Sequence, residues 1–255
     1  MNLKRKDLKI IMLIIGIFII YLLAVTFVFK RNPLDVISPS YIVNSDGLFW
    51  NYSNGKISDM GTSFNKIDGN YIIFLNNGDE VKGDAYNKAG TISVVKSGSS
   101  ELMTSGYVLA TNIGGLDFIK YEVDNISPSS NRMIRNYLND FSGSSLEEFD
   151  VEEVRLDLDD DSEEDILYFL SNLKNRDNGI KKSAILISDG SGIKQTVVDS
   201  ALERYDLYAI VDINGDGKKE LIVKKRALAE VGYDECYQLY GIEDGKYKVI
   251  HDCEL

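Results

Sequence analysis

The sequence predicts a mainly β protein that follows an N-terminal membrane helix, and three observations support this fold class. Short runs rich in β-branched and aromatic residues alternate with turn dipeptides such as Asn77-Gly78 over residues 41–125. Two acidic loops, each flanked by such runs, repeat at a fixed spacing within residues 144–255. An uncharged, apolar run at residues 10–29 precedes both regions.

Residues 10–29 are predicted to form a transmembrane signal-anchor helix, because about 20 apolar residues cross the ~30 Å hydrocarbon layer of a membrane. Four basic residues precede this run and two follow it. The positive-inside rule therefore places residues 1–9 in the cytoplasm. The alternative is a cleaved signal peptide, but its apolar region has only about 7–15 residues and ends at a small-residue site. Residues 30–40 are expected to form a linker, and the rest of this single-pass chain is expected to be extracellular.

The chain beyond residue 31 is strongly acidic. Residues 1–31 hold six of the 28 basic residues and one of the 40 acidic residues, so the remainder carries a formal net charge of −17. Such a surface repels nucleic acid and anionic lipid, and it attracts cations. We therefore expect no nucleic-acid partner.

Residues 41–125 are expected to form a β-meander, with turns at Asn54-Gly55, Asn77-Gly78 and Gly114-Gly115. Residues 126–143 are expected to form one amphipathic helix. Its apolar side chains recur at helical spacing and should pack against a sheet: Met133, Ile134, Tyr137, Leu138 and Phe141.

The most informative motif is the acidic loop from Asp212 to Glu220, between two apolar runs that read as strands. Oxygen-bearing side chains stand at loop positions 1, 3, 5 and 9, with glycine at positions 4 and 6. Ca²⁺ takes six to eight oxygen ligands at about 2.3–2.6 Å, and a tight loop can supply them. The candidate ligands are Asp212, Asn214, Asp216 and Glu220. An EF-hand is excluded because position 12, which would need a glutamate, is Val223.

A second copy of this pattern lies 55 residues upstream, with acids at the equivalent positions: Asp157, Asp159, Asp161 and Asp165. Position 6 is Ser162 instead of glycine, and a positive φ there would carry a steric cost. We therefore expect the upstream loop to bind metal more weakly. The alternative for either loop is a solvated acidic turn, since Asn-Gly and Asp-Gly form turns without metal.

The two loops resemble the calcium-binding repeats of the integrin-α-type propeller family, called FG-GAP or VCBS-like repeats. The resemblance covers roughly residues 150–255 and implies a propeller-like stack of β units. It also implies that the position-7 carbonyls, those of Lys218 and Glu163, complete the two Ca²⁺ sites. No Phe-Gly or Gly-Ala-Pro signature accompanies either loop, so the resemblance does not extend to a complete blade.

Cys236 and Cys253 flank a predicted hairpin whose turn is Asp244-Gly245. Each cysteine lies eight residues from its side of the turn, which would place the two residues opposite each other. An oxidising exterior would permit a disulfide. A bulge in the hairpin would instead leave two packed thiols, and the sequence leaves both readings open.

The sequence holds no recognisable catalytic motif, and its only histidine, His251, has no nucleophile context beside it. We therefore expect a non-enzymatic, membrane-anchored calcium-binding protein that acts as a binding or scaffolding module at the cell envelope. Its partner would be an envelope protein or a glycan. The alternatives are an envelope sensor or accessory subunit of a membrane complex, and a glycan-active envelope enzyme with a carboxylate pair.

Overall fold

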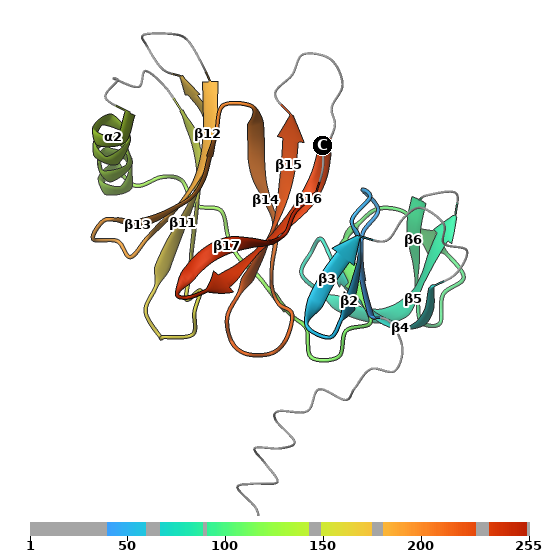
Figure 1. Cartoon of the computed structure of the whole chain (residues 1–255). Helices are drawn as coiled ribbons and strands as arrows, with labels where there is room; N and C mark the ends of the chain where they lie inside the picture. The colour runs from blue at the N-terminus through green and yellow to red at the C-terminus, as the bar shows by residue number, and fades with distance from the viewer. Residues whose placement is uncertain are drawn as a thin grey trace, which may run out of the picture. The chain divides into compact units, whose positions relative to one another are not determined.

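Three antiparallel β-sheets and one α-helix make up the part of the chain that the structure describes (Figure 1). This computed structural model describes residues 40–59, 67–88, 91–142, 149–174, 181–227 and 235–253. The predicted mainly β fold is confirmed. The predicted cytoplasmic tail, transmembrane helix and linker up to Pro39 lie outside these residues. Within the described residues, no helix is long and apolar enough to cross a membrane.

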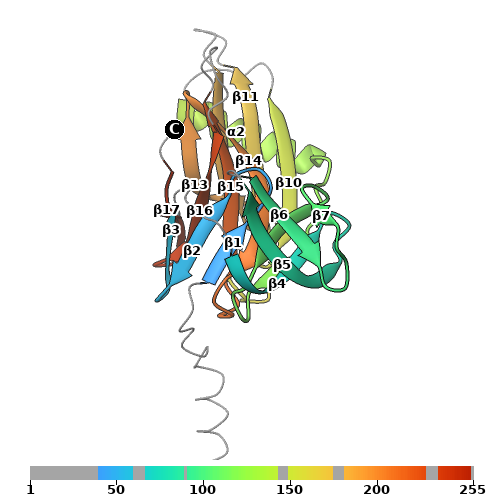
Figure 2. The ribbon, with the colours of Figure 1, turned by 90° about the vertical axis from the view of Figure 1, so that its right-hand side faces the viewer.

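The N-terminal half forms a curled eight-stranded sheet in the order β3-β2-β1-β8-β4-β5-β6-β7, and Figure 2 shows the curl of β4 and β5. Its strands are β1 (Ser40–Val43), β2 (Phe49–Ser53), β3 (Lys56–Asp59), β4 (Ile67–Leu75), β5 (Glu80–Lys88), β6 (Thr91–Lys96), β7 (Leu102–Met103) and β8 (Tyr107–Thr111). The order differs from a simple meander because β8 pairs with both β1 and β4.

The predicted hairpin turns are present in this sheet. Asn54 and Gly55 both have positive φ, 52° and 74°, and they join β2 to β3 through the pair Ser53 and Lys56. Asn77-Gly78 lies between β4 and β5, which pair antiparallel. Asn54-Gly55 is a two-residue turn with positive φ at both residues, which matches the right-handed twist of the strands. Asn77-Gly78 lies in a longer connection, in which Gly78 has a positive φ of 82° and Asn77 does not.

The strand β9 (Asp117–Ile119) belongs to a different sheet from the strands before it. It pairs with β14 (Glu203–Asp212), where Phe118 lies opposite Val211. The chain therefore passes from the eight-stranded sheet to the C-terminal part of the molecule at Gly114-Gly115, a turn that the sequence predicted.

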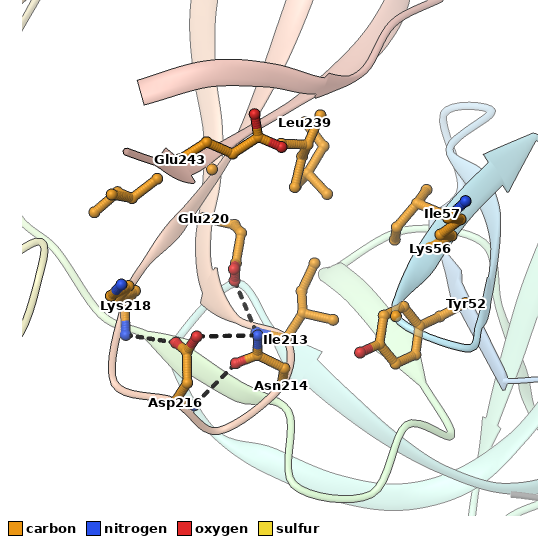
Figure 3. A pocket seen from close by; sticks show the side chains of 14 residues that line it. Tyr52, Lys56, Ile57, Ile213, Asn214, Asp216, Lys218, Glu220, Leu239 and Glu243 are labelled. Atoms are coloured by element: carbon orange, nitrogen blue, oxygen red, sulfur yellow. Dashed lines mark hydrogen bonds between the residues drawn. The ribbon is translucent and has the colours of Figure 1, made fainter. Parts of the chain in front are cut away.

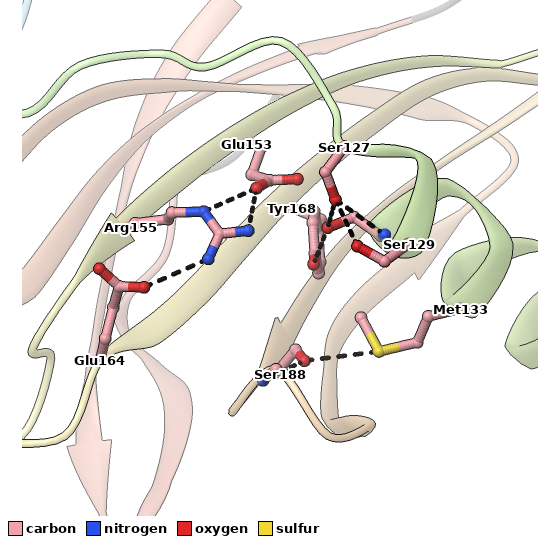
Figure 4. A network of polar contacts seen from close by, with 10 residues as sticks. Ser127, Ser129, Met133, Glu153, Arg155, Glu164, Tyr168 and Ser188 are labelled. Atoms are coloured by element: carbon pink, nitrogen blue, oxygen red, sulfur yellow. Dashed lines mark hydrogen bonds and ion pairs between the residues drawn. The ribbon is translucent and has the colours of Figure 1, made fainter.

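The helix α2 (Pro128–Ser142) confirms the predicted amphipathic helix. Ser127 caps its N-terminus, since the Ser127 hydroxyl accepts the Ser130 N–H at 3.0 Å. Ile134 and Leu138 are buried against a sheet, as expected. Figure 4 shows a further tie, in which the Tyr168 hydroxyl donates to the Ser130 hydroxyl at 3.1 Å.

Beside α2, an ion pair between a buried carboxylate and a more exposed guanidinium lies at the start of the following sheet. The Glu153 side chain is almost fully buried, and its Oε1 binds the guanidinium of Arg155 (Figure 4). The same guanidinium reaches Glu164 at 3.2 Å. Arg155 therefore joins the buried Glu153 to Glu164, near the end of the upstream acidic loop.

The two predicted repeats form two four-stranded antiparallel units, each with its strands in sequence order. The first consists of β10 (Asp150–Leu156), β11 (Asp165–Lys174), β12 (Lys181–Ser188) and β13 (Ile193–Ser200). The second consists of β14, β15 (Glu220–Ala227), β16 (Glu235–Glu243) and β17 (Lys246–His251), with β9 added at its edge. The 55-residue offset read from the sequence is therefore a repeat of structure as well.

The five-stranded sheet buries both of its faces. Ala209, Ile222 and Leu239 pack in a core shared with the eight-stranded sheet. Ile210, Leu221 and Tyr240 pack in a core shared with the four-stranded sheet. Because both faces are covered, its central strands carry continuous apolar runs at 209–211 and 221–223 instead of an alternating pattern.

Cys236 and Cys253 form a disulfide, with their Cα atoms 6.1 Å apart. The β16–β17 ladder contains a register shift between Leu239 and Tyr240, so counting outward from the turn does not continue unchanged to the cysteines. The Cα separation nevertheless falls within the usual range for a disulfide. The bond therefore ties the start of β16 to the chain beyond β17.

Candidate metal centre

Both acidic loops connect adjacent antiparallel strands, as the sequence predicted. The downstream loop, residues 212–220, joins β14 to β15, and the upstream loop, residues 157–165, joins β10 to β11. The residue before each loop pairs with the last residue of that loop: Val211 lies opposite Glu220, and Leu156 lies opposite Asp165. The strands thus bring position 1 and position 9 of each loop close together.

In the downstream loop, the position-1 carboxylate organises the backbone. Asp212 Oδ1 accepts the N–H of Gly215 at 2.7 Å, and its Oδ2 accepts the N–H of Gly217 at 2.8 Å. At the other end, Glu220 Oε2 accepts the N–H of Ile213 at 2.9 Å. Asn214 Oδ1 and Asp216 Oδ1 likewise accept backbone N–H groups of the loop, so these bonds together hold it in a tight coil.

The upstream loop repeats the three bonds made by Asp212 and Glu220. Asp157 Oδ1 accepts the N–H of Asp160 at 2.8 Å, and its Oδ2 accepts the N–H of Ser162 at 2.9 Å. Asp165 Oδ2 accepts the N–H of Leu158 at 3.2 Å. Each of these three bonds lies 55 residues from its counterpart, so the two loops share one backbone design.

The backbone angles confirm the expected strain at position 6 of the upstream loop. Ser162 has φ of 71°, where the downstream loop has Gly217 with φ of 90°. A second strained residue was not expected: Asp160, at position 4, has φ of 65° and corresponds to Gly215. The glycine at position 4 of the downstream loop, Gly215, was the sequence signal that could have identified Asp160 as a strained residue.

The structure brings three of the predicted upstream ligands together. Carboxylate oxygens of Asp157, Asp159 and Asp165 all lie within 4.8 Å of one another. The side chains of Asp161 and Glu163 are exposed, and Asp161 Oδ1 accepts the N–H of Glu163 at 2.7 Å. Positions 1, 3 and 9 therefore form an acidic cluster that could hold a metal ion.

In the downstream loop the same three positions are Asp212, Asn214 and Glu220. Asp212 and Glu220 are buried, whereas Asn214 is exposed and adds an amide oxygen in place of a carboxylate. The other two predicted ligand residues, Asp216 and Lys218, are exposed, and Asp216 Oδ1 accepts the N–H of Lys218 at 2.9 Å.

The position-9 carboxyl groups lie in environments that disfavour their negative charge. Burial, followed by the charges of Asp212 and Asp216, raises the pKa of Glu220 to about 7. Burial also raises the pKa of Asp165, and the neighbouring acids of its loop raise it further. A cation bound in either loop would favour the ionised form of that loop's position-9 carboxyl group.

One face of the downstream loop borders a cavity of about 450 Å³ (Figure 3). Asn214, Asp216, Lys218 and Glu220 line it on the loop side. Across the cavity lie residues of the β2–β3 hairpin, among them Tyr52. The loop is therefore open to solutes on this side.

The two loops are in direct contact, which the sequence did not indicate. The Lys219 N–H donates to the Leu158 carbonyl at 2.9 Å. A Cβ on Gly217 would lie 2.6 Å from Asp160 Oδ2, so a side chain at this position would force Asp160 to shift. The Tyr247 hydroxyl donates to the Lys219 carbonyl at 2.6 Å.

His251 takes part in packing. Its Nε2 lies 3.0 Å from Asp59 Oδ1, and its ring meets Trp50 edge-on with centroids 5.3 Å apart. These contacts join β17 to β3 and β2.

No protein-family model matches this chain, and neither a curated protein nor a solved structure matches it significantly. The function of the two loops therefore has to be inferred from their own geometry.

Proposed function

We propose that this chain is a membrane-anchored, extracytoplasmic calcium-binding β-repeat protein, in which Ca²⁺ stabilises the fold of a binding or scaffolding module at the cell envelope. The observation that carries this proposal is the pair of loops with equivalent hydrogen bonds, one of which gathers Asp157, Asp159 and Asp165 within 4.8 Å.

The donor set favours calcium over other metals. The candidate ligands are carboxylates, one amide and backbone carbonyls, all of them hard oxygen donors, whereas structural zinc sites and copper sites are built mainly from nitrogen and sulfur ligands. Oxygens that share one Ca²⁺ at about 2.3–2.6 Å can lie up to roughly 5 Å apart. The 4.8 Å limit of the upstream group fits this range. Mg²⁺ would require a smaller, near-ideal octahedron.

A structural role for the ion follows from where the loops lie. Each loop closes a strand pair of a repeat sheet, and the downstream loop buries Asp212 and Glu220. Buried carboxylates that face further carboxylates are unfavourable without a compensating cation. Ca²⁺ would supply that charge and hold the strand ends together.

The disulfide supports the proposed location outside the cytoplasm. Disulfides persist in oxidising compartments and are rare in the cytosol, and Cys236 and Cys253 form one. Residues 10–29 would anchor this acidic domain to the membrane. A propeller-like stack is the proposed arrangement of the repeats, supported by a five-stranded sheet that shares a core on each face with another sheet.

Calcium titration of the full chain tests the proposal. The protein is purified in detergent, stripped with EDTA and titrated by calorimetry, with Mg²⁺ as the comparison ion. We expect one or two Ca²⁺ to bind, and the free energy of unfolding to rise by about 2.7 kcal/mol at a hundredfold excess over Kd.

The matched control is the variant Asp157→Asn/Asp212→Asn, which removes one charge from each loop at position 1 and keeps the side-chain volume. It should show much weaker calcium binding and little thermal stabilisation. If the unchanged chain shows neither heat nor a melting shift at millimolar Ca²⁺, the proposed function is wrong.

A further inference from the structure

We infer that the upstream loop is a positioning element for the downstream calcium site, so that filling one loop raises the affinity of the other. This inference rests on the proposed calcium binding and adds that the two sites are coupled. The spacing of the two motifs alone suggests independent sites, and the contact between Lys219 and Leu158 indicates otherwise.

The first step is the peptide that joins Lys218 to Lys219. Its carbonyl is the proposed position-7 ligand of the downstream site, and its N–H is the group that donates to the Leu158 carbonyl at 2.9 Å. The described peptide bonds include no cis bond, and in a trans peptide the C=O and N–H point in opposite directions. The bond to Leu158 therefore sets the direction of the Lys218 carbonyl.

The second step is the way in which Leu158 itself is held. Its N–H donates to Asp165 Oδ2, the position-9 ligand of the upstream site, at 3.2 Å. Its side chain is 1 % exposed and packs in the core that the repeat sheets share. A change in the Asp165 carboxylate on binding a cation would thus act on Leu158 and, through it, on the Lys218–Lys219 peptide.

Tyr247 adds a second connection, which links the downstream loop to the first repeat sheet. Its hydroxyl donates to the Lys219 carbonyl at 2.6 Å. Gln195 of β13 holds the backbone of Tyr247 through two hydrogen bonds, at 2.7 and 3.0 Å.

The test observes the downstream loop alone. That loop contains Gly215 and Gly217, whereas the upstream loop contains no glycine. In the full chain labelled with ¹⁵N-glycine, the amide signals of these two residues report calcium at the downstream site. They are assigned by replacing each glycine with alanine in turn.

Two matched variants are then compared with the unchanged chain. Asp157→Asn removes an upstream ligand, and Glu164→Gln removes the same charge from the same loop at an exposed residue that is not a proposed ligand. We expect Asp157→Asn to raise the calcium midpoint of the Gly215 and Gly217 signals at least fivefold, since couplings between sites typically change affinity by about 5- to 150-fold. Glu164→Gln should change it less than twofold. Asp159→Ala repeats the test at an exposed side chain, in case Asp157→Asn disturbs the backbone bonds of its own loop.

The outcomes separate the inference from the proposed function. If the unchanged chain shows no calcium response at all, the proposed function fails. If calcium binds but the midpoint is the same in all variants, the loops are independent and the inference is overturned. Equal shifts in Asp157→Asn and Glu164→Gln would also overturn it, because loss of charge alone would then explain the effect.

Discussion

At the scale of single residues, the two loops differ most in backbone strain, although their backbones adopt the same conformation. The downstream loop has glycine at both positive-φ positions, Gly215 and Gly217, whereas the upstream loop has Asp160 and Ser162. A left-handed conformation costs a residue with a side chain roughly 1–2 kcal/mol, although aspartate tolerates it better than most. Ser162 is therefore the more strained of the two.

The variant Ser162→Gly should raise the free energy of unfolding of the calcium-free chain by about 0.5–1 kcal/mol, since the relief of strain exceeds the added flexibility of the unfolded chain. Urea denaturation measures the change. The control is Ser97→Gly, at an exposed turn serine whose φ is not positive. That change should destabilise slightly, and a loss of stability in both variants would contradict the assigned strain.

Much of the candidate site could be predicted at this scale. The alternation of oxygen-bearing residues identified the loops, and the missing glycine at Ser162 identified one strained position. The burial of Glu220 and the contact of Lys219 with Leu158 could not be predicted, because both depend on how the two repeat sheets pack. Burial and tertiary contacts between loops leave no local pattern in the sequence.

At the scale of secondary-structure elements, turn chemistry predicted hairpins well and strand order less well. Asn54-Gly55 and Asp244-Gly245 each have two positive φ angles and join the strands expected of them. The insertion of β8 between β1 and β4 and the pairing of β9 with β14 could not be predicted. These pairs join strands far apart in the sequence, and no turn residue encodes them.

The disulfide is an element-scale feature with a direct test. Cys236 and Cys253 close a loop with a sequence separation of 17, and a disulfide of this loop length typically contributes about 3 kcal/mol. The double variant Cys236→Ser/Cys253→Ser should therefore lower the free energy of unfolding by about that amount, as measured by denaturant titration.

The control for this prediction is the unchanged chain treated with reductant, which should lose a similar amount. Intact-mass measurement with and without reductant, after alkylation, establishes the redox state of freshly isolated protein. Two alkylated thiols in the unreduced sample would contradict the bond.

At the scale of the whole molecule, the five-stranded sheet is the element that joins the other two sheets. Its apolar residues alternate between two cores, one shared with the eight-stranded sheet and one with the four-stranded sheet. The 55-residue repeat predicted two similar β units. The repeat could not show which of the two units would be buried on both faces, because that burial also depends on how the N-terminal sheet packs.

Two matched isoleucines test whether this shared sheet makes residues 40–255 a single cooperative unit. Ile222 lies in the core toward the eight-stranded sheet and Ile210 in the core toward the four-stranded sheet, and both are 0 % exposed. Replacing a buried isoleucine with alanine typically costs about 2–5 kcal/mol. Because both side chains belong to one sheet, Ile210→Ala and Ile222→Ala should each move one common calorimetric transition to lower temperature, with equal calorimetric and van't Hoff enthalpies. Two separate transitions, each moved by only one of the variants, would show instead that the two cores unfold independently.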